Sequence, residues 1–490
     1  MRYGARARSR TRRRRVYSTN VAHSGQWSVV SGQLSVARPS YYSAAELDRI
    51  DVTMDPRLES LLSPAGPKEF ATQFKGLRQI YPDIDSFLAD LATLALRLYE
   101  PFYDDAPRGF YGLTCAAQAE SLFADPWRLY AQQLWGLRVD RKRSAFQLPG
   151  SAPRKGGKGE RWSATQKALV SQDPEQALSF AQTFLCEPDE RNFFRARLSM
   201  FGLADLALGG HKFNYLAQSW MLADRLAFRQ AEALLFGPLH LFAVADRRAD
   251  PTEWLARLEI PGGPELTSDL DSSLAAEAAK AFIGGTAEES VKALEDLFSR
   301  RIRLDRVFDL LLKTAAQVIA NARRGAWLPG LRAFHATFFS AECGAWFEPG
   351  DQAKAAALCA LLINQASLET RALEPNPPLD DVIRRFCPTN PFDVLRSVIS
   401  HSDPFASATA VYAILGMDDE KKEELFRTLA AQAAKNDGEN CRGHDLLVVS
   451  QARSAFQRSG GSESELFPAV AGFVLGQVPK TYSLAAEYGV

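Results

Sequence analysis

Helical periodicity runs through almost the whole chain, and it restricts the possible folds more than any other feature. Apolar residues recur at steps of three and four, which places them on one face of a helix. Within residues 68–100, for example, Ile84, Phe87 and Leu91 follow this spacing, and Pro82 breaks the segment into two helices. Runs that alternate apolar and polar residues, as strands do, are almost absent. The sequence therefore predicts an all-α protein with little or no β-sheet.

The same periodicity continues along the rest of the chain. Alanine-rich segments such as AAEAAKAFIGG and TLAAQAAK favour closely packed antiparallel pairs, as in bundles or α-solenoids. No period of 34 or 40 residues is sustained, so we expect a large irregular multi-helix body rather than a repeat array. Further helices are expected at 115–123, 126–136, 164–186, 189–208, 211–245, 268–283, 287–299, 304–323, 329–346, 351–370, 390–400, 404–415, 418–435, 444–458 and 463–476.

The segment 147–163 (QLPGSAPRKGGKGERWS) is rich in Gly, Pro and Lys and indicates an exposed linker or loop. We place the main internal boundary here, between an N-terminal helical subdomain at 54–150 and a main helical domain at 164–490. With 490 residues the chain has ample material for a core. No stretch of eighteen uncharged apolar residues occurs, so no membrane span is expected.

The first 53 residues differ from the rest and are expected to be a disordered Arg-rich extension. Nine arginines and no acidic residue lie in residues 1–45, so residues 46–490 carry 49 basic and 58 acidic residues, a net charge of −9. Such an extension could be a targeting peptide or a nucleic-acid-binding arm. The tandem heptads SGQWSVV and SGQLSVA favour a third interpretation, translated repeat DNA, with Met54 as a candidate initiator.

Composition also limits the partners. The main body is acidic and shows no cluster of Lys and Arg that would track phosphates, so we expect no nucleic-acid partner and a small-molecule ligand instead. Six cysteines are scattered without CxxC spacing, which indicates neither a zinc ribbon nor a disulfide framework. A reducing, cytoplasmic location fits this usage best. The sequence does not indicate an oligomeric state.

Histidines near helix starts are the best indication of chemistry. The positive end of a helix dipole disfavours imidazolium, and the neutral ring is the form that binds metals. We predict a transition-metal site, because four imidazoles with few carboxylates suit Fe, Zn, Cu or Ni rather than Mg or Ca. For each ring the alternative is a buried histidine that packs in the core. The candidate ligands are His211, His335, His401 and His444.

Other residues on the same helices are candidates for the surroundings of this site. Aromatic side chains could form a pocket for a flat organic substrate, although such a stripe is more often plain core; these are Tyr215, Phe338, Phe339 and Trp346. Polar side chains could orient the ligands; these are Gln218, Glu342, Asp403 and Gln451. Glu342 could equally pair with an arginine at the surface. His240 lies in an apolar run and is expected to be structural, and Lys212 is expected to face solvent.

Three short segments, Gly-His-Lys-Phe at 210–213, Phe-His-Ala-Thr at 334–337 and Gly-His-Asp at 443–445, each open a long apolar helix. Their order resembles the questin oxidase-like family over roughly residues 60–480. The resemblance implies an all-α, oxygenase-like fold in which histidines, with a modified lysine in some members, hold a mononuclear non-haem iron. It implies oxidative opening of aromatic polyketide rings, and it maps onto His211, His335 and His444.

The chain departs from this pattern after His444, where Leu447 stands in place of the lysine of an H-x-x-K arrangement. This leaves the lysine ligand open, with Lys212 and Lys354 as substitutes if geometry allows. The expected function is thus a metal-dependent, iron-containing oxidoreductase that acts on an aromatic or polyketide-like small molecule. One alternative is a non-catalytic helical scaffold or interaction protein. A second, suggested by the pair His444-Asp445, is an HD-type metal phosphohydrolase.

Overall fold

The computed structural model describes most of the chain after residue 55. The described residues are 56–61, 66–97, 108–139, 150–245, 266–322, 325–348, 350–371, 390–435, 443–459 and 462–478, with single positions at 247, 253, 256, 258 and 480. The Arg-rich extension 1–53, Met54, Cys387 and Cys441 lie outside them. Residues 46–490 form one unit by their internal contacts, and everything below concerns this unit.

The prediction of an all-α fold is confirmed. Helices account for nearly all regular structure in the described residues, where no strand forms and one isolated parallel bridge pairs Ser268 with Ile302. The first half contains α1 (Pro56–Leu61), α2 (Pro67–Arg78), α3 (Ile84–Arg97), α4 (Arg108–Ala119), α5 (Pro126–Val139), α6 (Lys158–Val170), α7 (Pro174–Gln182), α8 (Pro188–Ala204), α9 (His211–Arg225) and α10 (Ala231–Val244).

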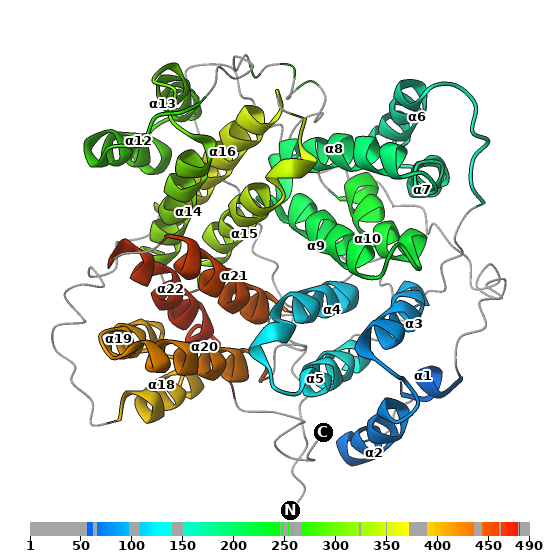
Figure 1. Cartoon of the computed structure of the whole chain (residues 1–490), viewed down its shortest axis with the longest axis horizontal. Helices are drawn as coiled ribbons and strands as arrows, with labels where there is room; N and C mark the ends of the chain where they lie inside the picture. The colour runs from blue at the N-terminus through cyan, green and yellow to red at the C-terminus, as the bar shows by residue number, and fades with distance from the viewer. Residues whose placement is uncertain are drawn as a thin grey trace, which may run out of the picture. The chain divides into compact units, whose positions relative to one another are not determined.

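The second half continues in the same way (Figure 1). It contains α12 (Ser272–Gly284), α13 (Ala287–Ser299), α14 (Leu304–Ala320), α15 (Leu328–Glu342), α16 (Gln352–Arg371), α18 (Pro391–Ser400), α19 (Pro404–Leu415), α20 (Asp419–Ala433), α21 (His444–Ser459) and α22 (Leu466–Leu475), with short 3-10 turns between some of them. Some contacts join helices close in the chain, such as α14 with α15 and α18 with α19, and others join distant ones, such as α19 with α22 and α4 with α21. Among the described residues no helix is long and apolar enough to cross a membrane.

Local chemistry explains many of the helix ends. Short polar side chains at N-caps accept a backbone N–H of the first turn, as Asp271 does from Leu274 and Thr286 does from Glu289. Thr286 and Glu289 form a reciprocal capping box. These signals lie in the sequence, and the bounds of α12 and α13 come within a few residues of the predicted ones.

Two predicted helices are each broken in two. The segment predicted as one helix at 211–245 is α9 and α10, separated by a turn in which Ala227, Phe228 and Gln230 have positive φ angles of 50°, 61° and 58°. The segment predicted at 164–186 is likewise divided, at Gln172, where φ is 62°. Left-handed residues end a helix, but they are usually Gly or Asn, so the left-handed residues themselves mark neither turn. The second turn is marked instead by Asp173 and Pro174, the N-cap and first residue of α7, a signal that the prediction of one helix overlooked.

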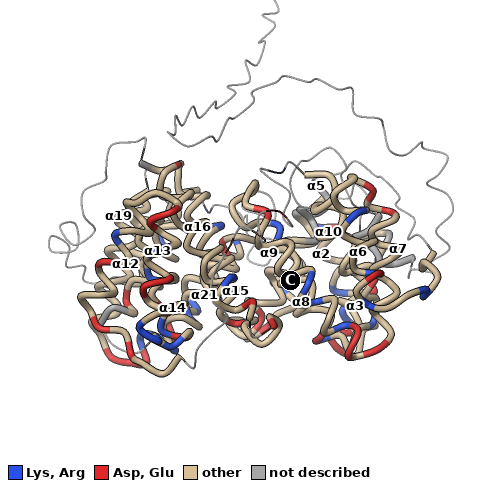
Figure 2. Tube along the Cα trace, turned by 90° about the horizontal axis from the view of Figure 1, so that it is seen from above, with Lys and Arg blue, Asp and Glu red and all other residues tan. Residues whose placement is uncertain are grey.

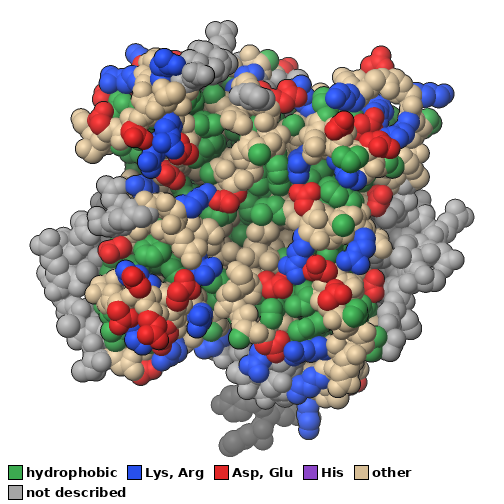
Figure 3. All heavy atoms as spheres, in the orientation of Figure 1, with side chains coloured by type: hydrophobic (Ala, Val, Ile, Leu, Met, Phe, Trp, Pro, Cys, Tyr) green, Lys and Arg blue, Asp and Glu red, His purple; other side chains and the backbone are tan. Residues whose placement is uncertain are grey.

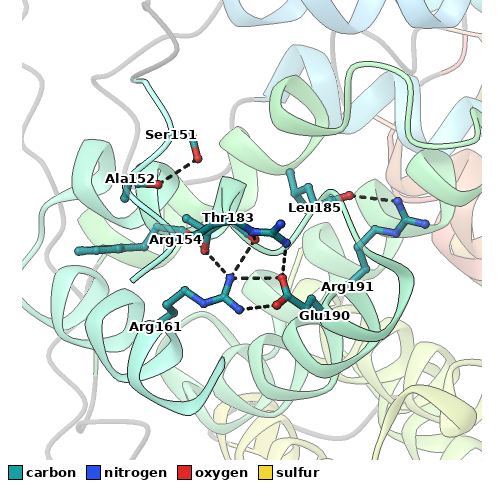
Figure 4. A network of polar contacts seen from close by, with 9 residues as sticks. Ser151, Ala152, Arg154, Arg161, Thr183, Leu185, Glu190 and Arg191 are labelled. Carbon is teal, nitrogen blue, oxygen red and sulfur yellow. Dashed lines mark hydrogen bonds and ion pairs between the residues drawn. The ribbon is translucent and has the colours of Figure 1, made fainter. Parts of the chain in front are cut away.

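The segment predicted as exposed is exposed at nearly every described position from 150 to 160. It is also hydrogen-bonded to neighbouring helices over residues 150–157. Ala152 donates to the carbonyl of Ser179, and Arg154 reaches the carbonyl of Thr183 and the carboxylate of Glu190 (Figure 4). Arg161, buried on α6, joins the same carboxylate at 2.6 Å. Arginine donors on both sides lower the pKa of Glu190. The helix itself begins at Lys158, inside the predicted linker.

Charges are spread along the described helices rather than gathered on one of them. Figure 2 shows basic and acidic residues interspersed along the trace, and Figure 3 shows both signs mixed with apolar side chains over one face. Many of these charges form pairs with each other, such as Arg225 with Asp85 and Glu120. Exposed pairs of this kind contribute little to stability individually.

Candidate functional site

Four neighbouring helices, α4, α9, α15 and α21, are labelled near the middle of Figure 1, and three of them carry a candidate ligand: His211 on α9, His335 on α15 and His444 on α21. Each contacts the next, in the order α4–α9–α15–α21 and back to α4. A side-chain hydrogen bond spans every one of the four contacts, so the arrangement is closed. The bonds are Thr114 to Gln218, Asn214 to the carbonyl of Arg332, His335 to Gln451, and Ser450 to the carbonyl of Gln118.

Glycines at two helix starts allow this close approach. Gly210 and Gly443 directly precede His211 and His444, the first residues of α9 and α21, and have φ angles of +85° and +93°. A Cβ on Gly210 would lie 2.7 Å from the Cβ of Ala336 on α15. A Cβ on Gly443 would lie 2.6 Å from that of Cys115 on α4. Both positions therefore require glycine for conformation and for space.

Three of the four predicted ligands come together. The ring centroids of His211 and His444 are 5.4 Å apart, and those of His335 and His444 are 5.5 Å apart with planes inclined by 7°. We call His211, His335 and His444 the histidine cluster. His211 and His335 are buried and His444 is partly buried. Rings separated by 233 residues of sequence thus share one interior point.

The protonation of His335 follows from its surroundings. Its Nδ1 lies 2.6 Å from the amide oxygen of Gln451, an acceptor, so Nδ1 carries the proton and Nε2 carries the lone pair. That Nε2 is buried and has no hydrogen-bond partner. Burial lowers the pKa of His335 to about 3, Gln451 opposes this shift, and the neighbouring His211 adds to it. His335 is therefore a neutral imidazole whose Nε2 carries a buried lone pair that accepts no hydrogen bond.

Tyr111 on α4 is a member of the site that sequence analysis missed. Its ring centroid lies 5.1 Å from that of His211 and 5.0 Å from that of His444. It also contacts Tyr215 edge-on at 5.6 Å, and both tyrosines are buried. The predicted substrate residue Tyr215 is thus next to the cluster. Tyr111 was missed because α4 was predicted to begin at residue 115, so its first turn was not examined.

Two of the predicted orienting residues are close to the cluster. Gln451 holds His335, as described. Gln218 is buried on α9, where its Oε1 accepts from the hydroxyl of Thr114 at 3.2 Å and from the thiol of Cys115 at 3.0 Å. Gln218 therefore fixes α4, the helix that carries Tyr111, against α9.

The other two have different roles. Asp403 is the N-cap of α19 and accepts from the backbone of Ala406. Glu342 is exposed and pairs with Arg458. This is the surface ion pair that the sequence analysis gave as the alternative to an orienting role. Neither residue has a contact with the histidine cluster among the interactions of the described residues.

His401 lies apart from the other three candidate ligands. It is the exposed C-cap of α18, and its Nδ1 lies 2.7 Å from the carbonyl of Ser397 in its own last turn. Ser402 follows with a φ of 58°, and Asp403 then caps the next helix. This ring serves a helix end at the surface.

The remaining aromatic candidates also lie elsewhere on α15 and beyond. Phe338 packs against Phe339 and beneath the guanidinium of Arg458, and Trp346 contacts Arg195 at 4.9 Å. These contacts direct Phe338 and Trp346 toward charged surface residues. The aromatic neighbours of the cluster are instead Tyr111, Tyr215 and, beside His335, Phe334 at 6.2 Å.

Two buried lysines lie near the cluster: Lys212 follows His211 in the sequence, and Lys480 pairs with the residue after His444. The prediction that Lys212 faces solvent is wrong: it is fully buried and paired with Asp205, with Arg247 also 3.9 Å from that carboxylate. Lys480 is fully buried and paired with Asp445, the residue after His444. Asp445 is therefore already engaged, which disfavours a phosphohydrolase that would need it for a metal. Lys354 is partly exposed on α16 and lies 3.7 Å from Asp351.

His240 is buried in α10, as expected of a structural histidine. Its ring centroid lies 5.5 Å from that of Phe236, and burial lowers its pKa to about 3. His240 is therefore neutral, like His335, but it is not part of the histidine cluster.

Two further observations describe the state of the site. Among the described residues, no group of three or more His, Cys, Asp and Glu side chains already has the spacing needed to hold a metal ion. A surface cavity of about 520 Å³ lies at α3 and the α9–α10 turn, where Tyr81, Asp90 and Arg229 line it. None of its lining residues belongs to the histidine cluster.

Searches of protein-family models, curated proteins and solved structures found no match to this chain.

Proposed function

We propose that the protein binds a transition-metal ion through His211, His335 and His444 and is an iron-dependent oxidoreductase. The observation that carries the proposal is the buried Nε2 of His335, which has no hydrogen-bond partner and lies beside two further imidazoles. A buried polar atom without a partner costs about 1–3 kcal/mol. A bound ion would remove that cost.

The spacing of the rings supports a shared ion. Imidazole nitrogens bind such ions at roughly 2.0–2.1 Å, which brings the centroids of two rings on one ion to about 4.5–5.5 Å. The separations of 5.4 and 5.5 Å are at the upper end of that range. No group of the described side chains is already placed to hold a metal ion. Binding would therefore require His211 and His444 to move toward Nε2 of His335, while Gln451 keeps its hydrogen bond to Nδ1 of His335.

The environment favours redox chemistry on an organic molecule. Neutral nitrogen donors suit Fe, Zn, Cu or Ni, and of these iron best fits the resemblance described above. A bound iron ion would supply one-electron and dioxygen chemistry. The chain itself supplies buried aromatic neighbours, Tyr111 and Tyr215, which suit an aromatic small-molecule substrate. Cys186, Cys343 and Cys359 form no disulfide, which supports a reducing, cytoplasmic location.

Metal analysis of the purified full chain tests the proposal. We expect about one ion per chain after loading with Fe²⁺ under anaerobic conditions, and loss of that ion in His335→Ala and in His444→Ala. His401→Ala is the matched control, since its ring is exposed and contacts Ser397, and it should retain the metal. A metal-free wild-type protein, or equal binding in all three variants, would contradict the proposal.

Gln451→Leu gives a finer test of the ligand geometry. The amide oxygen fixes the proton on Nδ1 of His335, and loss of such a partner typically weakens metal affinity by about 10–100-fold. Gln365→Leu, which removes an exposed amide bonded to Glu369, should have no effect on affinity. Equal affinities for the two variants would mean that Gln451 does not orient a ligand.

A second candidate function, a non-catalytic helical scaffold, has its own support. The cavity described above lies away from the imidazoles, and the described residues hold no preformed metal group. In that case the cluster is a set of packing residues, and mutation of His335 should change stability alone. Metal content separates the two candidates directly.

A further inference from the structure

The surface cavity between α3 and the α9–α10 turn lies apart from the histidine cluster and has the size of a ligand site. Its volume of about 520 Å³ falls within the range of about 300–1,000 Å³ that is typical of small-molecule sites. Helices α3 and α10 contact each other, so two packed helices hold the walls in place. The side chains on these walls indicate which kind of molecule fits.

The turn on one side of the cavity is held in an unfavourable backbone conformation. Ala227, Phe228 and Gln230 have positive φ angles, which cost free energy in residues other than glycine and which cluster at ligand sites. The guanidinium of Arg191 lies 4.2 Å from the centroid of the Phe228 ring and holds the turn from outside. Packing therefore fixes the backbone of Arg229 and Gln230, both of which line the cavity, before any ligand binds.

Arg229 provides a cationic group to this cavity. Its Nε donates to the carbonyl of Leu226 at 3.3 Å, and among the described residues no ion pair engages its two terminal nitrogens. The pKa of the nearby Asp83 is lowered mainly by the backbone N–H of Ser86 and to a smaller extent by Arg229. Asp83 accepts from both the backbone N–H and the hydroxyl of Ser86, at 2.7 and 3.2 Å, so it serves to cap α3. The guanidinium therefore keeps a pair of donors that match a carboxylate.

Asp90 provides an anionic group on the α3 side. One of its carboxylate oxygens accepts from the hydroxyl of Tyr81 at 2.7 Å, which orients the group, and no lysine or arginine of the described residues pairs with it. Ile80, Pro82 and Ala89 add an apolar wall. Ile80 is 41 % exposed, which is unusual for a large apolar side chain of this protein. The cavity thus offers a cation, an anion and an apolar surface to one ligand.

We propose that this cavity binds a small zwitterion with an apolar side chain, of which an α-amino acid is the simplest example. The carboxylate of the ligand pairs with Arg229, its ammonium pairs with Asp90, and its apolar side chain covers Ile80. A plain carboxylate would leave Asp90 without a counter-charge, and a plain amine would leave Arg229 without one. The inference is independent of the proposed function, since no residue of the histidine cluster lines the cavity.

Titration of the full-length protein with L-phenylalanine, followed by saturation-transfer NMR, tests the proposal. L-leucine is the second probe. We expect saturable binding with a dissociation constant of about 1 mM or lower. Phenylacetate lacks the ammonium group, and phenethylamine lacks the carboxylate. Each should bind at least about tenfold more weakly than L-phenylalanine, because each loses one charge-assisted hydrogen bond.

Two variants assign the charged groups. Arg229→Gln should weaken L-phenylalanine binding at least about tenfold and leave phenethylamine binding unchanged, because phenethylamine has no carboxylate. Asp90→Asn keeps an oxygen that can accept from Tyr81, so the α3 side should stay folded. It should weaken L-phenylalanine binding by a similar factor and leave phenylacetate binding unchanged. A general loss of structure would instead weaken all the probes together.

Matched controls remove exposed charges elsewhere. Arg306→Gln and Asp419→Asn break surface ion pairs with Asp269 and Lys422, and both variants should bind every probe as the wild type does. The proposal is overturned if neither amino acid shows saturable binding up to about 10 mM. It is also overturned if phenylacetate binds as tightly as L-phenylalanine, or if Arg229→Gln binds L-phenylalanine normally. These results do not bear on the metal content of the histidine cluster, which is measured separately.

Discussion

The histidine cluster and the His401 turn begin from similar sequence and end in different environments. In both, a histidine at a helix boundary is followed closely by an aspartate. At His444, a left-handed glycine lets α21 start against α4, and Asp445 turns inward to Lys480. At His401, Ser402 takes the left-handed position and Asp403 caps α19 at the surface. The two histidines differ in their neighbours: a glycine before His444 leaves room for α4, whereas no glycine lies beside His401.

The largest loss of unfolding free energy is expected when the buried ion pair of Lys480 and Asp445, next to His444, is broken. Lys480→Met leaves the carboxylate of Asp445 buried without a partner, which we expect to destabilise the protein by about 3–5 kcal/mol. The double variant Lys480→Met with Asp445→Leu should recover most of that loss. Urea unfolding of both variants measures this. A small loss in the single variant would mean that Asp445 reaches solvent or another cation.

The second largest loss of stability is expected from a substitution of Gly443, the glycine before α21. Gly443→Ala adds a Cβ at 2.6 Å from that of Cys115, at a φ of +93°. We expect a loss of about 2–4 kcal/mol from strain and overpacking. Gly416→Ala, at the C-cap of α19 with a φ of −71°, is the control and should change stability little. Similar unfolding midpoints for the two variants would contradict the close approach of α21 and α4.

Acid should destabilise the protein through its buried histidines His335 and His240. His335 and His240 have pKa values of about 3 in the fold, against an ordinary value of 6.5. The unfolded chain binds more protons below pH 6.5, so their contribution to stability is complete above that pH and is lost as pH falls toward 3. At pH 5 the loss is about 2 kcal/mol for each ring.

Unfolding measured at pH 7.5 and pH 5 checks this prediction. His240→Leu should reduce the difference in unfolding free energy between the two pH values by about half. A pH dependence that does not change in His240→Leu would mean that this ring is protonated in the fold.

The smallest effect is expected at the His401 turn. His401→Ala removes one bond to the carbonyl of Ser397 at an exposed helix end, which should cost no more than about 0.5–1 kcal/mol. Thermal unfolding measures it. A loss comparable to that of Gly443→Ala would show that the two regions are energetically alike.

The fold was largely predictable because its signals are local. Periodicity and N-caps such as Asp271 and Thr286 set helix type and most bounds. The break at Gln172 could have been predicted from Asp173 and Pro174, which start the next helix. The break at Ala227–Gln230 carries no such signal, since residues of these types rarely adopt positive φ.

The site was predictable only in part, because it depends on contacts between distant segments. Glycine before His211 and His444 is a readable signal for a close helix start. His401 lacks that glycine, and the distinction was overlooked. Tyr111 and the burial of Lys212 depend on how α4 and Asp205 pack, and a side chain's own sequence neighbours do not carry that information.

The most direct test of the account is X-ray absorption spectroscopy of the iron-loaded full-length protein. The fine structure counts the imidazole ligands of the bound ion and their distances. We predict scattering from three imidazoles at roughly 2.0–2.2 Å, unchanged in His401→Ala, whereas His335→Ala should retain too little iron to give a signal. An ion surrounded by oxygen alone, with no imidazole scattering, would contradict the convergence of His211, His335 and His444 on a metal.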